Sequence, residues 1–251
     1  KRLEDSLKTL SKFIDAERKI SVCREMTKAH EQIVTDNCKN VLEEIYKGDI
    51  PLKGEIVLIV EGESKKKSNR FLLRCREKSD FNQYWYSAFT IQTLVDECER
   101  NGKRVAFLST PSVFFSCKED LRTRSAVFDF DEKFAKKGGK SFVKYDFNAP
   151  EKVPEEMLHK FDMVVIDPPF ITKEVWEKYA TTTKLLLSKE GETKILLTTV
   201  DENEKMIFEL LGCKRRKFRP SIPHLVYQYS LYSNYESEAL SKLNPEIPVF
   251  D

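Results

Sequence analysis

The sequence predicts an α/β fold with a mainly parallel, doubly wound sheet. Short apolar runs typical of strands alternate with helical segments along much of the 251-residue chain. One of these runs, Met163 to Ile166, is apolar at every position, as expected of a strand covered on both faces. With 40% hydrophobic and 33% charged residues, the chain has the composition of a globular protein with a sizeable core.

The first part of the chain predicts a small α/β segment. In chain order we expect a helix over residues 1–17, a strand over 20–23, the opening of a helix over 26–30, a helix over 38–46 and a strand over 55–61. Residues 62–69 are polar, charged and Gly/Ser-bearing, which is typical of a linker. We therefore predict a first segment over residues 1–63, a linker over 64–70 and the main domain over 71–251.

The main domain alternates more regularly between strands and helices. We predict strands over residues 104–109, 126–130, 142–145, 163–166 and 195–200, with helices over 87–100, 174–187 and 203–211. Thr110-Pro111-Ser112 is expected to form a turn. The stretch from Tyr227 to Tyr232 alternates as an antiparallel hairpin strand would.

The motif Asp167-Pro168-Pro169-Phe170 closes the fully apolar strand. Two successive prolines continue neither a helix nor a strand ladder. The motif therefore places a carboxylate and donor-free backbone at the carboxyl edge of a parallel sheet, where α/β folds bind ligands. The carboxylate and the Pro168 carbonyl can accept hydrogen bonds from an amine, and Phe170 can cover that amine with an aromatic face. The alternative is a proline-rich turn without chemistry.

Three other strand ends carry polar residues that suit a ligand. Small hydroxyl residues occupy 109–112, although this turn lacks the Gly-rich fingerprint of dinucleotide sites. Asp129 and Asp131 end the next strand, a position where a ribose diol is typically held. Asp146 and Asn148 follow the third strand and are able to read a base edge. Taken singly, each motif is also explained as a polar residue that ends a strand.

Five segments occur in order along the main domain: Gln-Tyr-Trp-Tyr-Ser at 83–87, Ser-Thr-Pro-Ser-Val at 109–113, Phe-Asp-Phe-Asp at 128–131, Tyr-Asp-Phe-Asn at 145–148 and Asp-Pro-Pro-Phe at 167–170. Together they resemble the elongation factor 1-alpha lysine methyltransferases, part of the wider N6-adenine-methyltransferase-like group. The resemblance covers about residues 71–235, including a basic-aromatic tail at 213–220. It implies a Rossmann-like, seven-stranded class I methyltransferase sheet and S-adenosylmethionine as methyl donor.

Position by position, the resemblance implies a role for each segment. The acceptor amine is held by Asp167, Pro168, Pro169 and Phe170. The cofactor is bound by Ser109, Thr110, Pro111 and Ser112 under its methionine part, by Asp129 or Asp131 at the ribose, and by Asp146 and Asn148 near the adenine. An aromatic wall or lid is formed by Tyr84, Trp85 and Tyr86, and a basic cluster for the substrate includes Lys214, Arg215 and Arg216. Phe170 departs from the commoner Tyr, and the turn at 109–112 lacks glycine, as it does across the family.

The resemblance favours a lysine of elongation factor 1-alpha as acceptor. The competing readings are an adenine N6-methyltransferase of RNA or DNA, and a non-enzymatic protein that binds ribosomes or RNA. The basic cluster can follow phosphates, attract an acidic protein surface, or protect a strand edge. A net charge of +2 gives little general attraction to nucleic acid and favours a protein acceptor. We expect Asp167 to position the amine rather than to act as a strong general base.

Residues 1–63 do not resemble the start of that family. The Cys23-to-Lys28 stretch and the strand that follows Lys53-Gly-Glu resemble the C-terminal region of ribosomal RNA small-subunit methyltransferase I. The part of that enzyme with glycine-rich cofactor loops is absent, so a ribosomal RNA methyltransferase fusion or a removed upstream half is expected, and the chain begins at Lys1 rather than Met. Arg24, Glu25 and Lys28 are the candidate functional positions of this segment.

Cysteine spacing and hydropathy predict an intracellular, cytoplasmic protein without a membrane partner. The six cysteines are scattered, none forms a C-x-x-C pair, and the three histidines lie far from any metal-ligand spacing. We therefore predict no metal site and reduced thiols. No apolar stretch approaches the roughly 18 to 20 residues that span a bilayer, and no secretory signal opens the chain.

Overall fold

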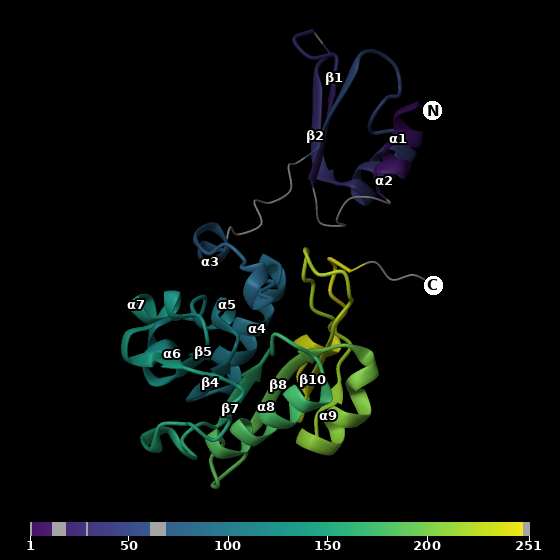
Figure 1. Ribbon diagram of the computed structural model, residues 1–251. Helices are drawn as coiled ribbons and strands as arrows, with labels where there is room; N and C mark the ends of the chain where they lie inside the picture. Colours follow the sequence, from purple (N-terminus) through teal and green to yellow (C-terminus); the bar gives the residue numbers. More distant parts are fainter. Residues whose placement is uncertain (1, 12–18, 29, 61–68, 248–251) are drawn as a thin grey trace. The chain divides into compact units, whose positions relative to one another are not determined.

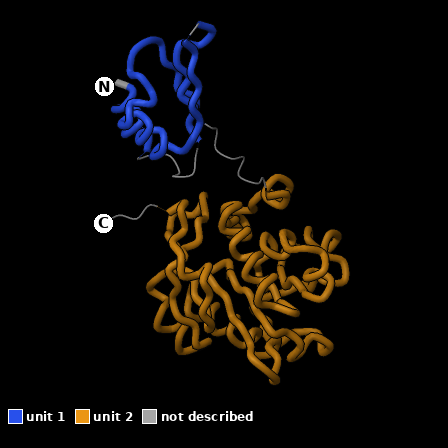
Figure 2. The backbone as a smooth tube through the Cα atoms, turned by 180° about the vertical axis from the view of Figure 1, so that it is seen from behind, with its two compact units in different colours: residues 1–67 blue, residues 68–251 orange. Residues whose placement is uncertain are grey.

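The computed structural model describes residues 2–11, 19–28, 30–60 and 69–247 (Figure 1). The chain divides into two compact units, residues 1–67 and 68–251 (Figure 2). Most of the linker predicted over residues 64–70 lies outside the described residues, which resume at Asn69. The last six positions of the helix predicted over 1–17 also lie outside them.

The first unit is a three-stranded antiparallel sheet, ordered β2-β1-β3, with two helices. Its elements are α1 (Arg2–Leu10), β1 (Lys19–Arg24), β2 (Gln32–Asn37), α2 (Cys38–Lys47) and β3 (Ile56–Val60). Helix α2 begins after Asn37, whose side chain accepts a hydrogen bond from the backbone of Asn40, and it ends at Gly48 with a φ of 86°. A small core of Leu7, Ile20 and Val41 joins the helices to one face of the sheet.

The helix predicted to open between Met26 and His30 is wrong, because its described residues, 26–28 and 30, form turns before the unpredicted strand β2. Glu25 and Thr27 have left-handed backbones, with φ of 49° and 65°, which an α-helix does not tolerate. The Glu25 carboxylate accepts a hydrogen bond from the backbone of Glu55 and pairs with Lys28 at 3.1 Å. Glu25 and Lys28, candidate functional positions in the sequence, thus stabilise the turn.

The second unit contains a seven-stranded sheet, ordered β6-β5-β4-β7-β8-β10-β9. Strands β4 to β8 run parallel, whereas β10 is antiparallel to β8 and to β9. The bounds are β4 (Val105–Leu108), β5 (Ala126–Asp129), β6 (Phe142–Lys144), β7 (Met163–Ile166), β8 (Lys194–Thr199), β9 (Lys214–Arg215) and β10 (Ser230–Ser233). The seven-stranded α/β sheet expected from the sequence is confirmed. The chain order reverses between β4 and β7, which is where doubly wound folds bind ligands.

Helices cover both faces of this sheet. Val105 and Phe107 of β4 pack in a core with residues of α4, whereas Ala106 and Leu108 pack in a second core with residues of α8 and α9. The helices are α3 (Arg70–Arg74), α4 (Ala88–Asn101), α5 (Pro111–Phe114), α6 (Glu119–Arg124), α7 (Ala135–Gly138), α8 (Lys173–Leu186) and α9 (Glu204–Leu211). The turn predicted at 110–112 opens the short helix α5, whose first residue is a proline.

The two long helices, α4 and α8, each begin after an N-cap residue with a side-chain hydroxyl. The side chain of Ser87 accepts a hydrogen bond from the backbone of Thr90 at the start of α4, and Thr172 caps α8 in the same way. These caps fix where α4 and α8 begin relative to the carboxyl edge of the sheet. Among the described residues, no helix is both long and apolar enough to cross a membrane.

Candidate active site

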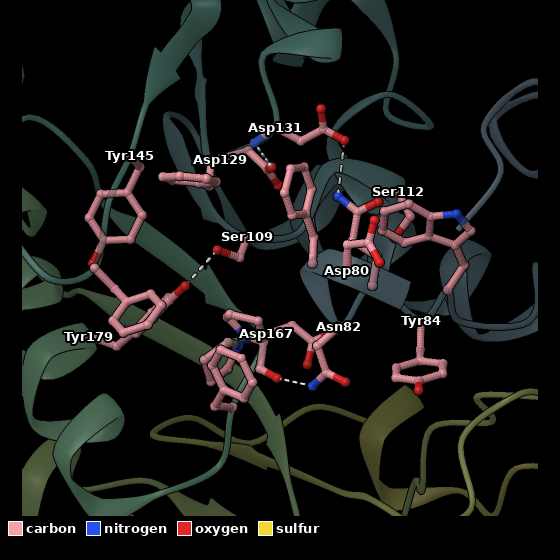
Figure 3. Close-up of a pocket in the computed structure, with 18 of the residues that line it drawn as sticks. Asp80, Asn82, Tyr84, Ser109, Ser112, Asp129, Asp131, Tyr145, Asp167 and Tyr179 are labelled. Carbon is pink, nitrogen blue, oxygen red and sulfur yellow. Dashed lines mark hydrogen bonds between the residues drawn. The ribbon is translucent and has the colours of Figure 1, made fainter. Parts of the chain in front are cut away.

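A cavity of about 360 Å³ lies at the carboxyl ends of the central parallel strands (Figure 3). The four strand-end motifs that the sequence analysis singled out all contribute to its wall. Its lining comprises residues 80–85, Ser109, Ser112, residues 129–131, 145–148 and 167–170, Tyr179, Ile222, Leu225 and Tyr229. The parallel order of β4, β5, β6 and β7 brings these ends to one edge, although they are far apart in the sequence.

Asp167 is the first residue after β7 and lines this cavity. Its backbone N–H donates to the carbonyl of Leu108 at 3.2 Å, which holds the end of β7 against β4. The hydroxyl of Thr198 donates to Asp167 Oδ1 at 2.9 Å. Burial raises the pKa of the Asp167 carboxyl to about 7, despite hydrogen bonds from Tyr86 and Thr198 that lower it.

Residues 167–170 form what we call the acceptor turn. The backbone oxygen of Pro169 accepts a hydrogen bond from the side-chain amide of Asn82. The Pro168 carbonyl accepts no hydrogen bond from any described residue. Phe170 is 49% exposed, and its ring centroid lies 6.3 Å from that of Phe147 in an edge-to-face arrangement.

Ser109 ends β4 in a left-handed conformation, with a φ of 54°. Its hydroxyl lies 2.6 Å from the hydroxyl of Tyr179 on α8 (Figure 3). Thr110 and Ser112 are almost fully buried, and Pro111 starts α5. Because a left-handed residue other than glycine is strained, the contact with Tyr179 helps to hold the turn in this shape.

The two aspartates at the end of β5 differ in their surroundings. Asp131 is held by Lys78 Nζ at 3.0 Å and Lys133 Nζ at 2.9 Å. Burial raises the pKa of Asp131, but its hydrogen bonds with the two lysines outweigh burial and leave the pKa lowered. The Asp129 carboxylate accepts one hydrogen bond from the described residues, donated by the backbone of Asp131 at 2.8 Å, and burial raises its pKa to about 7. Asp129 therefore has the freer carboxylate.

The predicted base-edge residues lie at the rim of the cavity. Asp146 and Asn148 are exposed, and the backbone of Asn148 donates to Asp146 Oδ1 at 2.9 Å. The side-chain oxygen of Asn148 accepts a hydrogen bond from Lys178 at 3.0 Å. Between the two, Phe147 lines the cavity and presents an aromatic surface there.

The three aromatic residues expected to form a wall or lid are placed differently. Tyr84 and Trp85 line the cavity, but Trp85 also packs edge-to-face on Phe71 with ring centroids 5.1 Å apart. Tyr86 lies outside the lining of the cavity, is 2% exposed, and places its hydroxyl 2.6 Å from Thr198 Oγ1. Tyr86 therefore stands behind Asp167 rather than over the opening.

The basic cluster does not line the cavity. Lys214 and Arg215 form β9, the edge strand of the sheet. Arg215 pairs with Asp201 at 3.2 Å, and Arg216 pairs with Glu236. This placement suits a charged strand edge that discourages pairing with other chains.

Four polar residues that were not predicted from the sequence line the cavity or contact Asp167: Asn82, Tyr179, Thr198 and Tyr229. Tyr229 lines the cavity, and burial together with the charge of Asp167 raises the pKa of its hydroxyl. Thr198 had a usable signal, because a hydroxyl at the end of β8 must lie beside the end of β7 in a parallel sheet. Tyr179 reaches the site from α8, and Asn82 and Tyr229 reach it from loops. No strand pairing places these three side chains, so the sequence does not predict their position.

Known proteins match the second unit. A sequence model for the family described as "Probable N6-adenine methyltransferase" matches residues 77–237. EEF1A lysine methyltransferase 1 of Mus musculus is 36% identical over 168 residues, covering 64% of this chain and 76% of that protein. Its counterpart in Danio rerio is 37% identical over 170 residues, covering 64% and 99%. A protein-lysine N-methyltransferase of Caenorhabditis elegans is 31% identical over 175 residues, covering 64% and 79%.

The family match lies wholly within the second unit, and it includes the whole lining of the cavity from Asp80 to Tyr229. The predicted resemblance of residues 1–63 to a ribosomal RNA methyltransferase stays a prediction. The chain is a methyltransferase that belongs to the N6-adenine-methyltransferase-like family, together with the EEF1A lysine methyltransferases.

Proposed function

We propose that this chain transfers a methyl group from S-adenosylmethionine to the ε-amine of a lysine in elongation factor 1-alpha. The observation that carries the proposal is that Asp167 lines an aromatic-walled cavity beside Pro168, whose carbonyl accepts no hydrogen bond from the described residues. A carboxylate and a free carbonyl suit an amine with two N–H groups to donate. The names of the relatives in mouse, zebrafish and nematode support lysine as the acceptor, and those of the mouse and zebrafish relatives support elongation factor 1-alpha as the protein. A cytoplasmic location agrees with that substrate.

The cavity fits the methyl donor by the chemistry of its polar groups. The Asp129 carboxylate can accept hydrogen bonds from the two ribose hydroxyls. The Asp131 carboxylate is less suited to this role, because it already pairs with two lysines. Phe147, Asp146 and Asn148 provide an aromatic face and polar atoms for the adenine, and the turn at 109–112 lies under the methionine part. When bound, the cofactor supplies a methyl group activated by a sulfonium.

The acceptor must be neutral, because an ammonium has no lone pair with which to attack. Free lysine has a pKa of about 10.4, so most of it is protonated near neutral pH. Burial among Tyr84, Phe170 and Tyr229 favours the neutral form of the amine. With a pKa of about 7, the Asp167 carboxyl is suited to act as a general base. From the sequence we expected it to position the amine rather than to act as a strong general base. We assign Asp167 both to orienting the amine and to accepting its proton.

A second candidate acceptor is the exocyclic amine of adenine. The half-exposed ring of Phe170, edge-on to Phe147, offers a surface on which a flipped base can stack. Against this, the basic residues of β9 lie outside the cavity wall, and Arg215 is paired with Asp201. No phosphate track therefore leads from β9 along the described wall of the cavity.

The test is methyl transfer from labelled S-adenosylmethionine to purified elongation factor 1-alpha, with RNA and DNA as parallel acceptors. We expect label on a lysine, and a loss of at least about 100-fold for Asp167→Ala. Asp120→Ala is the matched control, because Asp120 is an exposed carboxylate on α6 whose one ion pair with the described residues is to Arg124. Label in the nucleic acids alone would favour adenine. Full activity of Asp167→Ala would reduce the acceptor turn to a structural feature.

A further inference from the structure

A hydrogen-bonded series links the carboxylate of Asp167 to the hydroxyls of Thr198 and Tyr86, neither of which lines the cavity. Ile166 pairs with Leu197 in the parallel ladder of β7 and β8, so Asp167 and Thr198 follow as neighbours on the next step. Thr198 Oγ1 lies 2.9 Å from Asp167 Oδ1 and 2.6 Å from the hydroxyl of Tyr86. Thr198 and Tyr86 are each 2% exposed, so water cannot easily replace either contact.

The chemistry of these groups determines which atom donates and which accepts in each hydrogen bond. An ionised carboxylate only accepts hydrogen bonds, so Thr198 must give its one proton to Asp167. The single proton of Tyr86 then goes to Thr198 or to Asp167 itself, because the threonine has no second proton to offer. Both hydroxyls therefore direct their protons toward the carboxylate, and hydrogen bonds linked in this way strengthen one another.

The pattern of β8 also points to a function for this pair. Leu196, two residues before Thr198 on the same face, lies in the apolar core together with α4. The face changes from leucine to a hydroxyl at the step that lies beside Asp167. Burying two hydroxyls in this core is costly unless they are fully paired, and a valine and a phenylalanine would fill the same space without that cost.

We propose that Tyr86 and Thr198 are positioning residues that keep the Asp167 carboxylate ionised and aimed at the acceptor amine. This inference rests on the proposed function of Asp167. It gives the second tyrosine of the segment 83–87 a role different from the wall or lid expected from the sequence. Tyr86 precedes Ser87, the cap of α4, so the start of that helix fixes where the first donor stands.

Tyr86 and Thr198 are the two hydrogen-bond donors that favour the ionised form of Asp167. The titratable groups that face it are Tyr86 before α4, Tyr229 before β10 and Tyr179 on α8. No cationic side chain among the described residues contributes to its pKa, which burial raises and Tyr86 and Thr198 lower. Loss of either donor must therefore raise the pKa of Asp167 further above about 7.

The experiment is a pH titration of the aspartate carboxyl signals by carbon-13 NMR in the full chain, with Asp167→Asn identifying the signal. We expect Tyr86→Phe and Thr198→Val each to raise the pKa of Asp167 by about 1, and Thr198→Ser to restore it. The acid limb of the pH profile for methyl transfer should move upward by the same amount. Binding of S-adenosylmethionine should not change.

Matched controls are Thr199→Val, on the same strand, and Tyr232→Phe on β10. The hydroxyl of Thr199 accepts from Asn203, and that of Tyr232 donates to the carbonyl of Val200. Both are fully buried and neither lines the cavity, so they lose a hydroxyl without touching Asp167. A lower melting temperature in Tyr86→Phe and Thr198→Val, with an unchanged titration of Asp167, would overturn the inference. Absence of methyl transfer by the unmodified chain would overturn the proposed function instead, because the titration needs no acceptor.

Discussion

The side-chain amide of Asn82 donates a hydrogen bond to the backbone oxygen of Pro169, so the segment before α4 is tied to the acceptor turn. Asn82 ends a short 3-10 helix, Ser79–Phe81, in a left-handed conformation with a φ of 51°. Asparagine tolerates that conformation better than most residues, and here its side chain also reaches the turn. Two walls of the cavity that are far apart in sequence are thereby joined.

Asn82→Ala should lower kcat/KM for the protein acceptor by about 5- to 10-fold, the value of one neutral hydrogen bond. Steady-state kinetics measure this, and isothermal calorimetry should show unchanged cofactor affinity. Asn101→Ala is the control, because its amide also donates to a backbone oxygen, that of Glu97, at the other end of α4. Equal losses in both variants would contradict a role in the acceptor turn.

Asp129 and Asp131 should separate into a cofactor residue and a structural residue. Asp129→Ala should weaken binding of S-adenosylmethionine at least 10-fold in calorimetry, because in the proposed site its carboxylate accepts from both ribose hydroxyls. Asp131→Ala should instead lower the free energy of unfolding by about 1–3 kcal/mol, because Lys78 and Lys133 lose their buried partner. The reverse pattern, with Asp131 deciding affinity, would reassign the ribose.

The stability of the protein should depend on the charge of Asp167. Its pKa is raised from the usual 3.8 to about 7 in the folded state, so the folded protein binds this proton more tightly than the unfolded chain. Stability from this group is therefore complete below about pH 4 and is lost as the pH rises to about 7. Asp167→Asn should stabilise the fold by up to about 4 kcal/mol at pH 8 and by almost nothing at pH 4. Thermal unfolding at the two pH values measures the difference. Equal effects would show that burial of the charge is not what the substitution relieves.

The loop over residues 219–229 brings Ile222, Leu225 and Tyr229 to the cavity. His224 in this loop lies 2.7 Å from Glu77 Oε2, and the other oxygen of Glu77 accepts the backbone N–H of Trp85 at 2.7 Å. His224→Ala should speed protease cleavage within the loop and raise the KM for the acceptor by about 2- to 5-fold. His30→Ala, a change at an exposed histidine of the first unit, should do neither. An unchanged cleavage rate for His224→Ala would show that the contact does not hold the loop.

The sequence predicted the strand ends of the site well, because the motifs there are local and the parallel sheet brings carboxyl ends together. It could not place Tyr86, which differs from Tyr84 and Trp85 only in the direction taken by the chain before α4. Thr198 was missed although the hydroxyl at the end of its strand was a usable signal, because that signal is informative only once β8 is placed beside β7.

The first unit shows a different limit. Glu25 and Thr27 adopt left-handed backbones although neither is a residue that signals such a turn. A contact from Glu55, thirty residues later, stabilises the turn there, and no local pattern announces it. The stretch therefore reads as helical in sequence and folds as the connection of a hairpin.

The hydroxyl pair of Ser109 and Tyr179 has a consequence for how the two halves of the cavity communicate. Helix α8 begins three residues after Phe170 and carries Tyr179 in its second turn, so one helix follows the acceptor turn along the chain and also contacts the turn at 109–112. A glycine would hold the left-handed shape at position 109 by itself, whereas serine leaves that shape dependent on the helix. Any coupling between the two halves through α8 would be reciprocal, so that each ligand would change the affinity of its counterpart by the same factor.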